Sequence, residues 1–317
     1  MSGVTDAPFR RLAATLGAGL VVSEMTASDE LVRGNWMSQL RCEATGVGVH
    51  VVQLAGCEAH WMAEGAKVAE AAGADIIDIN MGCPARHVTG GQSGSALMRD
   101  LDHALTLIEA TISAVKVPVT LKMRLGWDDR SLNAPELARR AEAAGVQMIT
   151  VHGRTRCQFY KGEADWYAVR AVKDAVSVPL VVNGDITSYD KAVRALELSG
   201  ADAVMIGRGA QGQPWLPGQI GRRLETGQIE SAPALVEQLG HVRALYDEVC
   251  RHYGLRIGLK HARKHLGWAL ETAAQYSRAP AAKLKSWRQQ VLTSEDPRAV
   301  HRSLQDAFDD FAWSAAA

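Results

Sequence analysis

Short apolar runs alternate with longer alanine-rich segments of helical spacing along the first two-thirds of the chain. The apolar runs are short and rich in β-branched residues, which is typical of buried strands. We predict strands at 19–25, 50–54, 75–80, 118–123, 148–152, 179–183 and 202–207. The segments between them predict helices, for example over 61–72, 134–144 and 189–198.

Strand–helix alternation with nearly continuous apolar strands indicates a parallel sheet covered on both faces. Three helices run into a glycine just before the next strand (Gly73, Gly145 and Gly200), where a left-handed C-cap is favourable. The number and spacing of the units favour an α/β fold of the (β/α)8 TIM-barrel type. A complete barrel has eight strands. Residues 1–18 offer only a loop and a helix, so we expect the first barrel strand to be missing at the N-terminus.

The pattern changes after about residue 228, where strand-like runs end. The remaining segments predict helices at 232–253, 257–275 and 280–316, with breaks at Gly254, Gly258 and Pro280. We therefore expect a barrel domain over 1–228 and a small all-α domain over 229–317.

Charge is balanced over the whole chain, with 35 basic and 35 acidic residues, and by itself predicts no polyanionic partner. The stretch 251–288 differs, because it holds nine basic residues and a single acid, Glu271. Such a run is either a solvated helical face or a surface for a phosphate backbone. We take Lys260, Arg263 and Lys264 as its candidate contacts.

Cysteine usage points to a reducing compartment. The 317 residues hold five cysteines without a Cys-x-x-Cys pair, and an odd count argues against a fully paired disulfide framework. No run approaches the length of a membrane span. We expect a cytoplasmic monomer that does not bind a membrane.

Polar side chains cluster at the ends of the predicted strands. In a parallel barrel these ends share one mouth, where catalytic residues gather. The set is Gln53, Asn80, Cys83, Lys122, Arg124, His152, Asn183, Asp185, Gly207 and Arg208. It is rich in cations and donors and poor in carboxylates, which suits a flat, electron-rich anion. It does not suit a divalent metal.

Two tripeptides end the last two strands, Asn183-Gly184-Asp185 and Gly207-Arg208-Gly209. Loops at these positions of a barrel commonly bind phosphate through backbone N–H groups. Glycine allows close approach, and arginine adds a bidentate charge.

Three residues each have a functional and a structural interpretation. Cys83, next to a proline in a glycine-rich loop, is either a proton donor or nucleophile or a small buried filler. Lys122 either stabilises negative charge on a reduced ring or is a salt-bridged lysine of the barrel. His152 either donates to a ring or phosphate or is a satisfied structural histidine.

Motifs over nearly the whole chain resemble the flavin-dependent tRNA-dihydrouridine synthases, most closely their bacterial B-type branch. The most specific are Asp78-Ile-Asn-Met-Gly-Cys-Pro84, Lys122-Met-Arg-Leu-Gly-Trp127, Val151-His-Gly-Arg-Thr155 and Arg263-Lys-His-Leu-Gly-Trp268. This family places a short apolar strand ending in Ala-Pro before the position of Met1, which agrees with the missing first strand.

The resemblance implies an FMN-binding barrel, a helical tRNA-binding domain, and reduction of the C5–C6 double bond of particular uridines in tRNA, with NADPH as reductant. It implies that Cys83 is the general acid. The residues implied to hold FMN are Gln53, Lys122, His152, Asn183, Gly207 and Arg208, to which the phosphate argument adds Gly184 and Asp185. Those implied to face the uridine or its phosphate are Asn80, Arg124 and Tyr160.

Two other functions stay open. One is an FMN barrel enzyme that acts on a small molecule, of the dihydroorotate-dehydrogenase or ene-reductase kind, although such enzymes lack a basic helical appendage. The other is a non-catalytic RNA-binding or regulatory protein that kept the fold. The missing strand favours this last reading, and the presence of Cys83, Lys122 and His152 argues against it.

Overall fold

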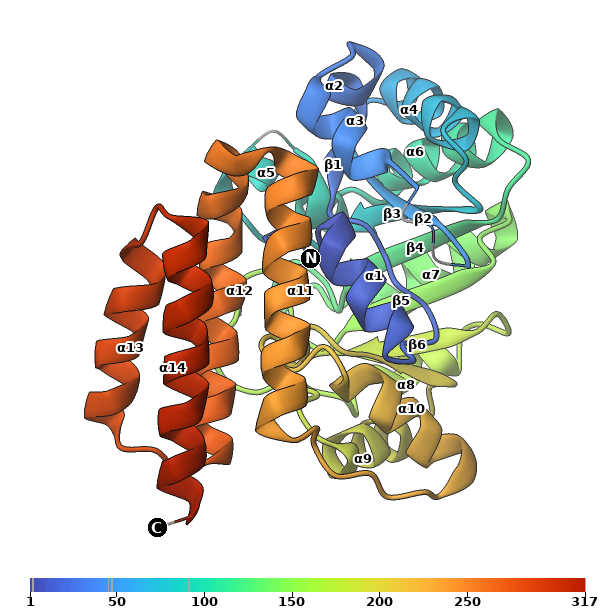
Figure 1. Cartoon of the computed structure of the whole chain (residues 1–317). Helices are drawn as coiled ribbons and strands as arrows, with labels where there is room; N and C mark the ends of the chain where they lie inside the picture. Colours follow the sequence, from blue (N-terminus) through green and yellow to red (C-terminus); the bar gives the residue numbers. More distant parts are fainter. Residues whose placement is uncertain (2, 45, 47, 91, 317) are drawn as a thin grey trace. The chain divides into compact units, whose positions relative to one another are not determined.

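The computed structural model describes residues 1, 3–44, 46, 48–90 and 92–316. The chain forms two compact units. The first, the barrel unit, joins Met1–Ala7 to Leu20–Gly209, and the second, the helical unit, joins Pro8–Gly19 to Ala210–Ala317 (Figure 1). The compact units therefore divide at 209/210, not after residue 228, and the helical unit also takes in residues 8–19.

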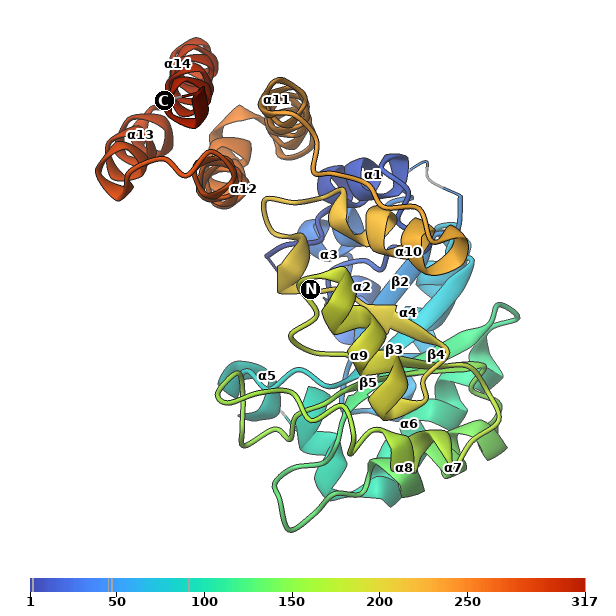
Figure 2. The same cartoon turned by 90° about the horizontal axis from the view of Figure 1, so that it is seen from below.

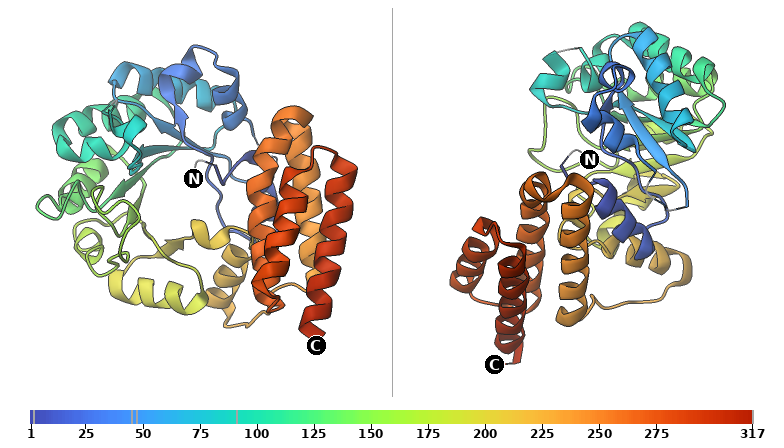
Figure 3. Two further views of the ribbon diagram at one scale, coloured as in Figure 1. Left: turned by 90° about the vertical axis from the view of Figure 1, so that its left-hand side faces the viewer. Right: turned by 45° about the horizontal axis from the view of Figure 1, so that its top comes forward.

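A parallel seven-stranded sheet forms the centre of the barrel unit, with its strands in sequence order. Its strands are β1 (Thr26–Ala27), β2 (Val51–Ala55), β3 (Ile76–Met81), β4 (Val119–Arg124), β5 (Met148–His152), β6 (Leu180–Asn183) and β7 (Ala203–Met205). Figure 3 shows the strands curving around a common centre with helices outside them. The predicted α/β barrel followed by a helical region is confirmed.

The predicted strand at 19–25 is largely absent. Only Val22 bridges to Val51, and the Ser23 N–H donates to the Val51 carbonyl at 3.1 Å, before β1 begins at Thr26. Within the described residues this segment has a strand neighbour on one side only, so a continuous ladder does not form.

The helices of the barrel unit follow the predicted spacing. They are α2 (Ser28–Val32), α3 (Trp36–Cys42), α4 (Ala59–Ala71), α5 (Arg86–Gly90), α6 (Leu101–Ala114), α7 (Ala134–Ala144), α8 (Arg170–Lys173) and α9 (Tyr189–Ser199), with 3-10 turns η1 (Gly94–Arg99) and η2 (Arg208–Ala210). Gly145 and Gly200 cap α7 and α9 in the left-handed conformation, at φ of 112° and 66°, as predicted.

The helical unit contains α10 (Leu216–Thr226), α11 (Leu235–Tyr253), α12 (Leu255–Tyr276), α13 (Ala281–Thr293) and α14 (Pro297–Ala316) (Figure 2). The predicted break at Gly258 is wrong, because this glycine lies inside α12. A Cβ there would come within 2.5 Å of the Cys250 Cα, so glycine lets α12 pack closely on α11. The predicted helix over 280–316 is two helices, α13 and α14.

Helix α1 (Ala7–Thr15) packs with the C-terminal helices despite its place at the start of the chain. The Phe9 ring stacks on His265 with centroids 5.4 Å apart, and Arg11 Nε pairs with Glu248 Oε1 at 2.6 Å. An amphipathic pattern does not show which hydrophobic core a helix joins. The predicted barrel domain over 1–228 therefore included this helix. In the described part of the chain no helix is both long and apolar enough to cross a membrane.

Candidate active site

Strand register brings the predicted polar residues to one edge of the sheet. Asn80 on β3 lies opposite Lys122 on β4. Arg124 lies opposite His152, and His152 lies opposite Asn183. Since these strands are parallel and end together, their terminal side chains share the carboxyl edge, as a barrel mouth requires.

The loop that carries Cys83 is held from two directions. Asn80 Oδ1 accepts the N–H groups of Gly82 and Cys83, at 3.1 and 2.9 Å. The Cys83 carbonyl accepts both the N–H and the hydroxyl of Ser95, at 3.0 and 2.8 Å. A Cβ on Gly94 would come within 2.8 Å of the same carbonyl, so only glycine permits this turn. The thiol thus projects from an anchored backbone.

A buried carboxylate behind this loop, Asp78, was not singled out from the sequence. Its two oxygens accept from Thr120 Oγ1 and Gln53 Nε2, both at 2.6 Å, and Gln53 Oε1 accepts from Asn80 Nδ2 at 2.7 Å. A chain of hydrogen bonds therefore runs from Thr120 to the Cys83 N–H. Burial raises the pKa of Asp78 above its ordinary value. The sequence signal that could have identified Asp78 is an acidic residue in the middle of the apolar run 74–79.

Lys122 lies beside this chain. Its Nζ donates to Asn183 Oδ1 at 3.2 Å, and Asn183 Nδ2 donates to the Met205 carbonyl at 2.8 Å. Burial lowers the pKa of Lys122 to about 8, although the charge of Asp78 acts in the opposite direction. A cation in such a position is poorly solvated and gains from any anionic group placed near it.

Arg124 is fully buried and bonds mainly to backbone. Its Nε donates to the Gly82 carbonyl at 2.8 Å, and Nη1 donates to the Thr155 and Phe159 carbonyls at 2.9 Å. Burial lowers its pKa to about 10. Its guanidinium carbon lies 5.6 Å from the centre of the Tyr160 ring. Arg124 thus ties the Cys83 loop to the loop after β5.

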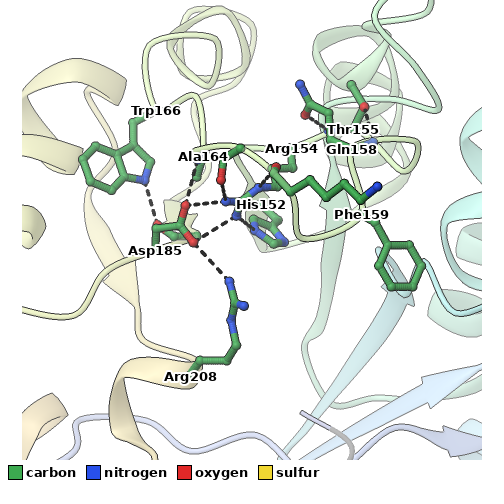
Figure 4. A network of polar contacts seen from close by, with 12 residues as sticks. His152, Arg154, Thr155, Gln158, Phe159, Ala164, Trp166, Asp185 and Arg208 are labelled. Carbon is green, nitrogen blue, oxygen red and sulfur yellow. Dashed lines mark hydrogen bonds and ion pairs between the residues drawn. The ribbon is translucent and has the colours of Figure 1, made fainter.

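Arg154 is a second residue that the sequence did not single out, although it belongs to the His-Gly-Arg-Thr motif. It forms a bidentate pair with Asp185, with Nη1–Oδ1 at 3.0 Å and Nη2–Oδ2 at 2.5 Å (Figure 4). The Ala164 N–H and Arg208 also donate to Asp185, at 2.9 and 3.2 Å. Burial raises the pKa of Asp185, but the hydrogen bonds and the two guanidinium charges outweigh it, and the pKa is lowered.

His152 is held neutral in this surrounding. Burial and the nearby cations, led by Lys122, lower its pKa to about 2. Arg154 Nη1 lies 3.4 Å from His152 Nε2 (Figure 4). Because arginine only donates, Nε2 is the acceptor, and this contact assigns the ring proton to Nδ1. His152 can therefore offer one N–H without adding charge.

The predicted phosphate loops contain one accessible cation. Arg208 is about half exposed, pairs with Asp185, and lies 5.1 Å from the Tyr160 ring centre. The Asp185 carboxylate is an acceptor already engaged, and it orients Arg154 and Arg208. Gly184 has φ of 119°, and the Gly207 backbone lies beside the Met1 side chain.

Lys260, Arg263 and Lys264 lie on α12 and belong to the helical unit, whereas the residues described above belong to the barrel unit. Lys260 is exposed. Two other members of the basic run are neutralised locally, because Lys283 pairs with Asp310 at 2.6 Å and Arg288 pairs with Glu271. The free positive charge is smaller than the nine-to-one count suggests.

The fold and the site together define a class of protein. It is a parallel α/β barrel with a thiol and several cations at the carboxyl edge of its sheet. The fold also resembles two solved structures, each with a TM-score of 0.52. One is 6-hydroxypseudooxynicotine amine oxidase from Pseudomonas geniculata N1, at 17% identity over 69% of this chain and 44% of the other. The second is histamine dehydrogenase from Rhizobium sp. 4-9, at 16% identity over 78% and 47%.

The chain belongs to the dihydrouridine synthase (Dus) family, whose pattern it matches over residues 1–312. It is 57% identical to a probable tRNA-dihydrouridine synthase of Rhizobium leguminosarum bv. phaseoli, over 98% of this chain and 93% of that protein. It is 44% identical to tRNA-dihydrouridine synthase B of Pseudomonas putida, over 95% and 94%. The expected family resemblance is thereby confirmed.

Proposed function

We propose that the protein is a tRNA-dihydrouridine synthase that reduces the C5–C6 double bond of particular uridines in cytoplasmic tRNA. The observation that carries this proposal is the anchored Cys83 loop beside Lys122, in a chain of the dihydrouridine synthase family. Uracil reduction needs a hydride at C6 and a proton at C5, and a thiol at the barrel mouth is a suitable acid.

The residues of the mouth fit FMN. Lys122, the neutral His152 and Arg208 supply donors, while both nearby carboxylates, Asp78 and Asp185, have their oxygens engaged within the protein. Such a set accepts an anionic ring and a phosphate without repelling them. Bound FMN, reduced by NADPH, would supply the hydride for C6.

The protein's own contribution is positioning and proton transfer. Cys83 Sγ donates its proton to C5, leaving a thiolate on the loop that Asn80 fixes. The ammonium of Lys122 offsets negative charge at the mouth. Tyr160, lying near both Arg124 and Arg208, faces the target uridine or its phosphate.

The target uridine must leave its stack, because a group inside folded tRNA cannot reach the mouth of a barrel. Recognition of the rest of the tRNA is by shape and phosphate contacts. Lys260, Arg263 and Lys264 on α12 are the proposed contacts for its backbone.

The test compares Cys83→Ala with the wild type, using tRNA that lacks dihydrouridine. We expect flavin binding to be retained and dihydrouridine formation to fall at least about a hundredfold, the usual contribution of a general acid. Cys157→Ala is the matched control, since this thiol is exposed and lies in the same unit. An unchanged rate in Cys83→Ala would disprove the acid assignment. A wild type that reduces no tRNA would disprove the function itself.

A further inference from the structure

A row of buried polar side chains crosses three adjacent strands of the barrel unit, below the mouth. Strand register places Gln53 of β2 opposite Asp78 of β3, and Asp78 opposite Thr120 of β4. The three side chains are between 3% and 5% exposed. Because side chains alternate along a strand, Asn80 and Lys122 face the same side of the sheet, one step closer to its carboxyl edge.

Asp78 is the acceptor at the centre of this row. Its Oδ1 accepts from Thr120 Oγ1 and its Oδ2 accepts from Gln53 Nε2, both at 2.6 Å. An ionised carboxylate only accepts hydrogen bonds, so both neighbours must turn a hydrogen towards it. Burial raises the pKa of Asp78, whereas these two hydrogen bonds and the charge of Lys122 act in the opposite direction. The carboxylate therefore decides which end of the Gln53 amide faces it.

The orientation of Gln53 fixes the orientation of the next amide. With Nε2 turned to Asp78, Gln53 presents Oε1 to Asn80, whose Nδ2 donates to it at 2.7 Å. Asn80 is left with Oδ1 pointing at the Cys83 loop, where it accepts the N–H groups of Gly82 and Cys83. Backbone N–H groups only donate, so the two ends of this path demand the same orientation of both amides.

The reverse orientation of the amides would disconnect the loop. If Gln53 turned its Oε1 to Asp78, two acceptors would face each other. Asn80 would then have to present Nδ2 to the N–H groups of Gly82 and Cys83, and donors that face donors leave buried polar atoms unsatisfied. A carboxylate at position 78 excludes this arrangement, whereas an asparagine there could offer either an acceptor or a donor.

We propose that Asp78 is a positioning residue for proton transfer, which acts on the Cys83 loop through the oriented amides of Gln53 and Asn80. The proposal rests on the proposed function, in which Cys83 is the proton donor. Burying a carboxylate in a row that apolar side chains could fill is unfavourable. The orientation of the loop that carries the thiol accounts for the presence of Asp78 in this row.

A purely supporting role of the row predicts a different pattern of effects. Thr120 contacts the same carboxylate but lies outside the path from Asp78 to Cys83. Thr120→Val should therefore keep the contact between Asp78 and Gln53, and it should affect the loop less than Asp78→Asn. Both replacements preserve shape and both change one polar group of the row. A role in barrel stability alone would make the two variants equivalent.

The first test measures alkylation of Cys83 by iodoacetamide in the full chain without tRNA, relative to the exposed Cys157. We expect Cys83 to react about fivefold faster in Asp78→Asn than in the wild type, the change that one net hydrogen bond corresponds to. The matched control is Asp75→Asn, just before the same strand, where the carboxylate accepts the His50 N–H. This control should react as the wild type does. An unchanged rate in Asp78→Asn, or an equal rate in Thr120→Val, would overturn the proposal.

The second test asks whether Asp78 acts through Asn80. In an Asn80→Ala background, Asp78→Asn should produce no further change in the alkylation of Cys83, because the path is already broken. Gln53→Met breaks the path between the two residues. This variant should release the loop to a similar extent, and it does not depend on how the barrel tolerates a change at position 78. Additive effects of Asp78→Asn and Asn80→Ala would rule out the path.

The third test separates positioning from tRNA binding. Asp78→Asn should lower kcat for dihydrouridine formation about fivefold and leave the KM for tRNA unchanged, because the proton donor is displaced while the proposed tRNA contacts on α12 are unaltered. A higher KM with an unchanged kcat would contradict the proposal. If the wild type reduces no tRNA, the proposed function fails, and the alkylation rates still decide whether Asp78 positions the Cys83 loop.

Discussion

Arg154 and Asp185 form a bidentate ion pair across two strand ends, with the Arg154 side chain 1% exposed and the Asp185 side chain 24% exposed. Arg154 also donates to the Lys161 and Gly162 carbonyls, at 3.1 and 2.6 Å. One buried guanidinium therefore fixes the loop after β5 and the loop after β6 together. Because Asp185 also holds Arg208, the pair sets the position of the accessible cation at the mouth.

Removing the carboxylate should destabilise the barrel unit. Asp185→Asn leaves Arg154 buried without its counter-charge, and we expect a loss of about 3 kcal/mol in the free energy of unfolding, measured in urea. Asparagine tolerates the positive φ of 55° at this position, so backbone strain does not confuse the result. Glu136→Gln, which removes an exposed pair with Arg139, should cost less than about 1 kcal/mol. Equal losses in the two variants would contradict the structural role of Arg154.

His152 should not titrate at physiological pH in the cofactor-free protein. Its folded pKa of about 2 lies below the ordinary 6.5, so neutral His152 supports the fold fully above pH 6.5. This contribution is lost progressively as pH falls towards about 2, because the unfolded chain binds the proton more readily. Ring resonances of His152 followed by NMR should stay constant from pH 5 to 8. A midpoint near 6.5 would contradict the assignment.

Lys122→Met should weaken FMN binding while keeping the fold. The variant keeps the apolar stem but loses the buried ammonium, and a charge-assisted contact of this kind corresponds to about tenfold or more in affinity. Flavin fluorescence titration measures the change. Lys116→Met, at the exposed approach to β4, is the control and should bind as the wild type does.

Lys122 also predicts a pH dependence of stability in the cofactor-free protein. Its folded pKa of about 8 lies below the ordinary 10.5, so the unfolded chain holds more protons between these values. Stability from this group therefore rises from pH 8 towards 10.5. This rise in stability should be missing in Lys122→Met. The change in Tm between pH 7.5 and 9.5, measured for the wild type and the variant, would show it.

Asn80→Ala should release the Cys83 loop. The N–H groups of Gly82 and Cys83 lose their shared acceptor. We expect dihydrouridine formation to fall about tenfold or more and alkylation of Cys83 by iodoacetamide to become faster, since the loop opens more often. The alkylation rate of Cys157 serves as an internal reference. Unchanged alkylation of Cys83 would mean that Ser95 alone holds the loop.

Reversing Lys260, Arg263 and Lys264 to glutamate should weaken tRNA binding and leave FMN binding intact. Each lost phosphate contact should reduce, by about one, the magnitude of the slope of log binding constant against log salt concentration. Lys283 and Arg288 pair with carboxylates, so their replacement should change tRNA affinity less. Filter binding over a range of salt concentrations would distinguish the two sets, and equal effects would refute the proposed surface.

Strands β3 and β4 were predicted to within one residue, because each places a fully apolar face against the surrounding helices (Ile77, Ile79 and Met81 in β3; Val119, Leu121 and Met123 in β4). The strand-end residues followed from barrel geometry alone. No local pattern marks Arg154 and Asp78 as site residues, because their roles depend on partners that follow or belong to other strands. The predicted break at Gly258 is wrong for the same reason, since this glycine accommodates Cys250 on another helix.

The order of folding follows from the position of α1. This helix is synthesised well before its partner Glu248, which lies 237 residues beyond Arg11 along the chain. Contacts of such long range form slowly, because a large loop must close before they stabilise anything. The barrel unit can therefore fold during synthesis, whereas the helical unit must wait until α11 and α12 have been synthesised, with the apolar face of α1 uncovered until then. Chains that end early should consequently be recognised by chaperones through α1.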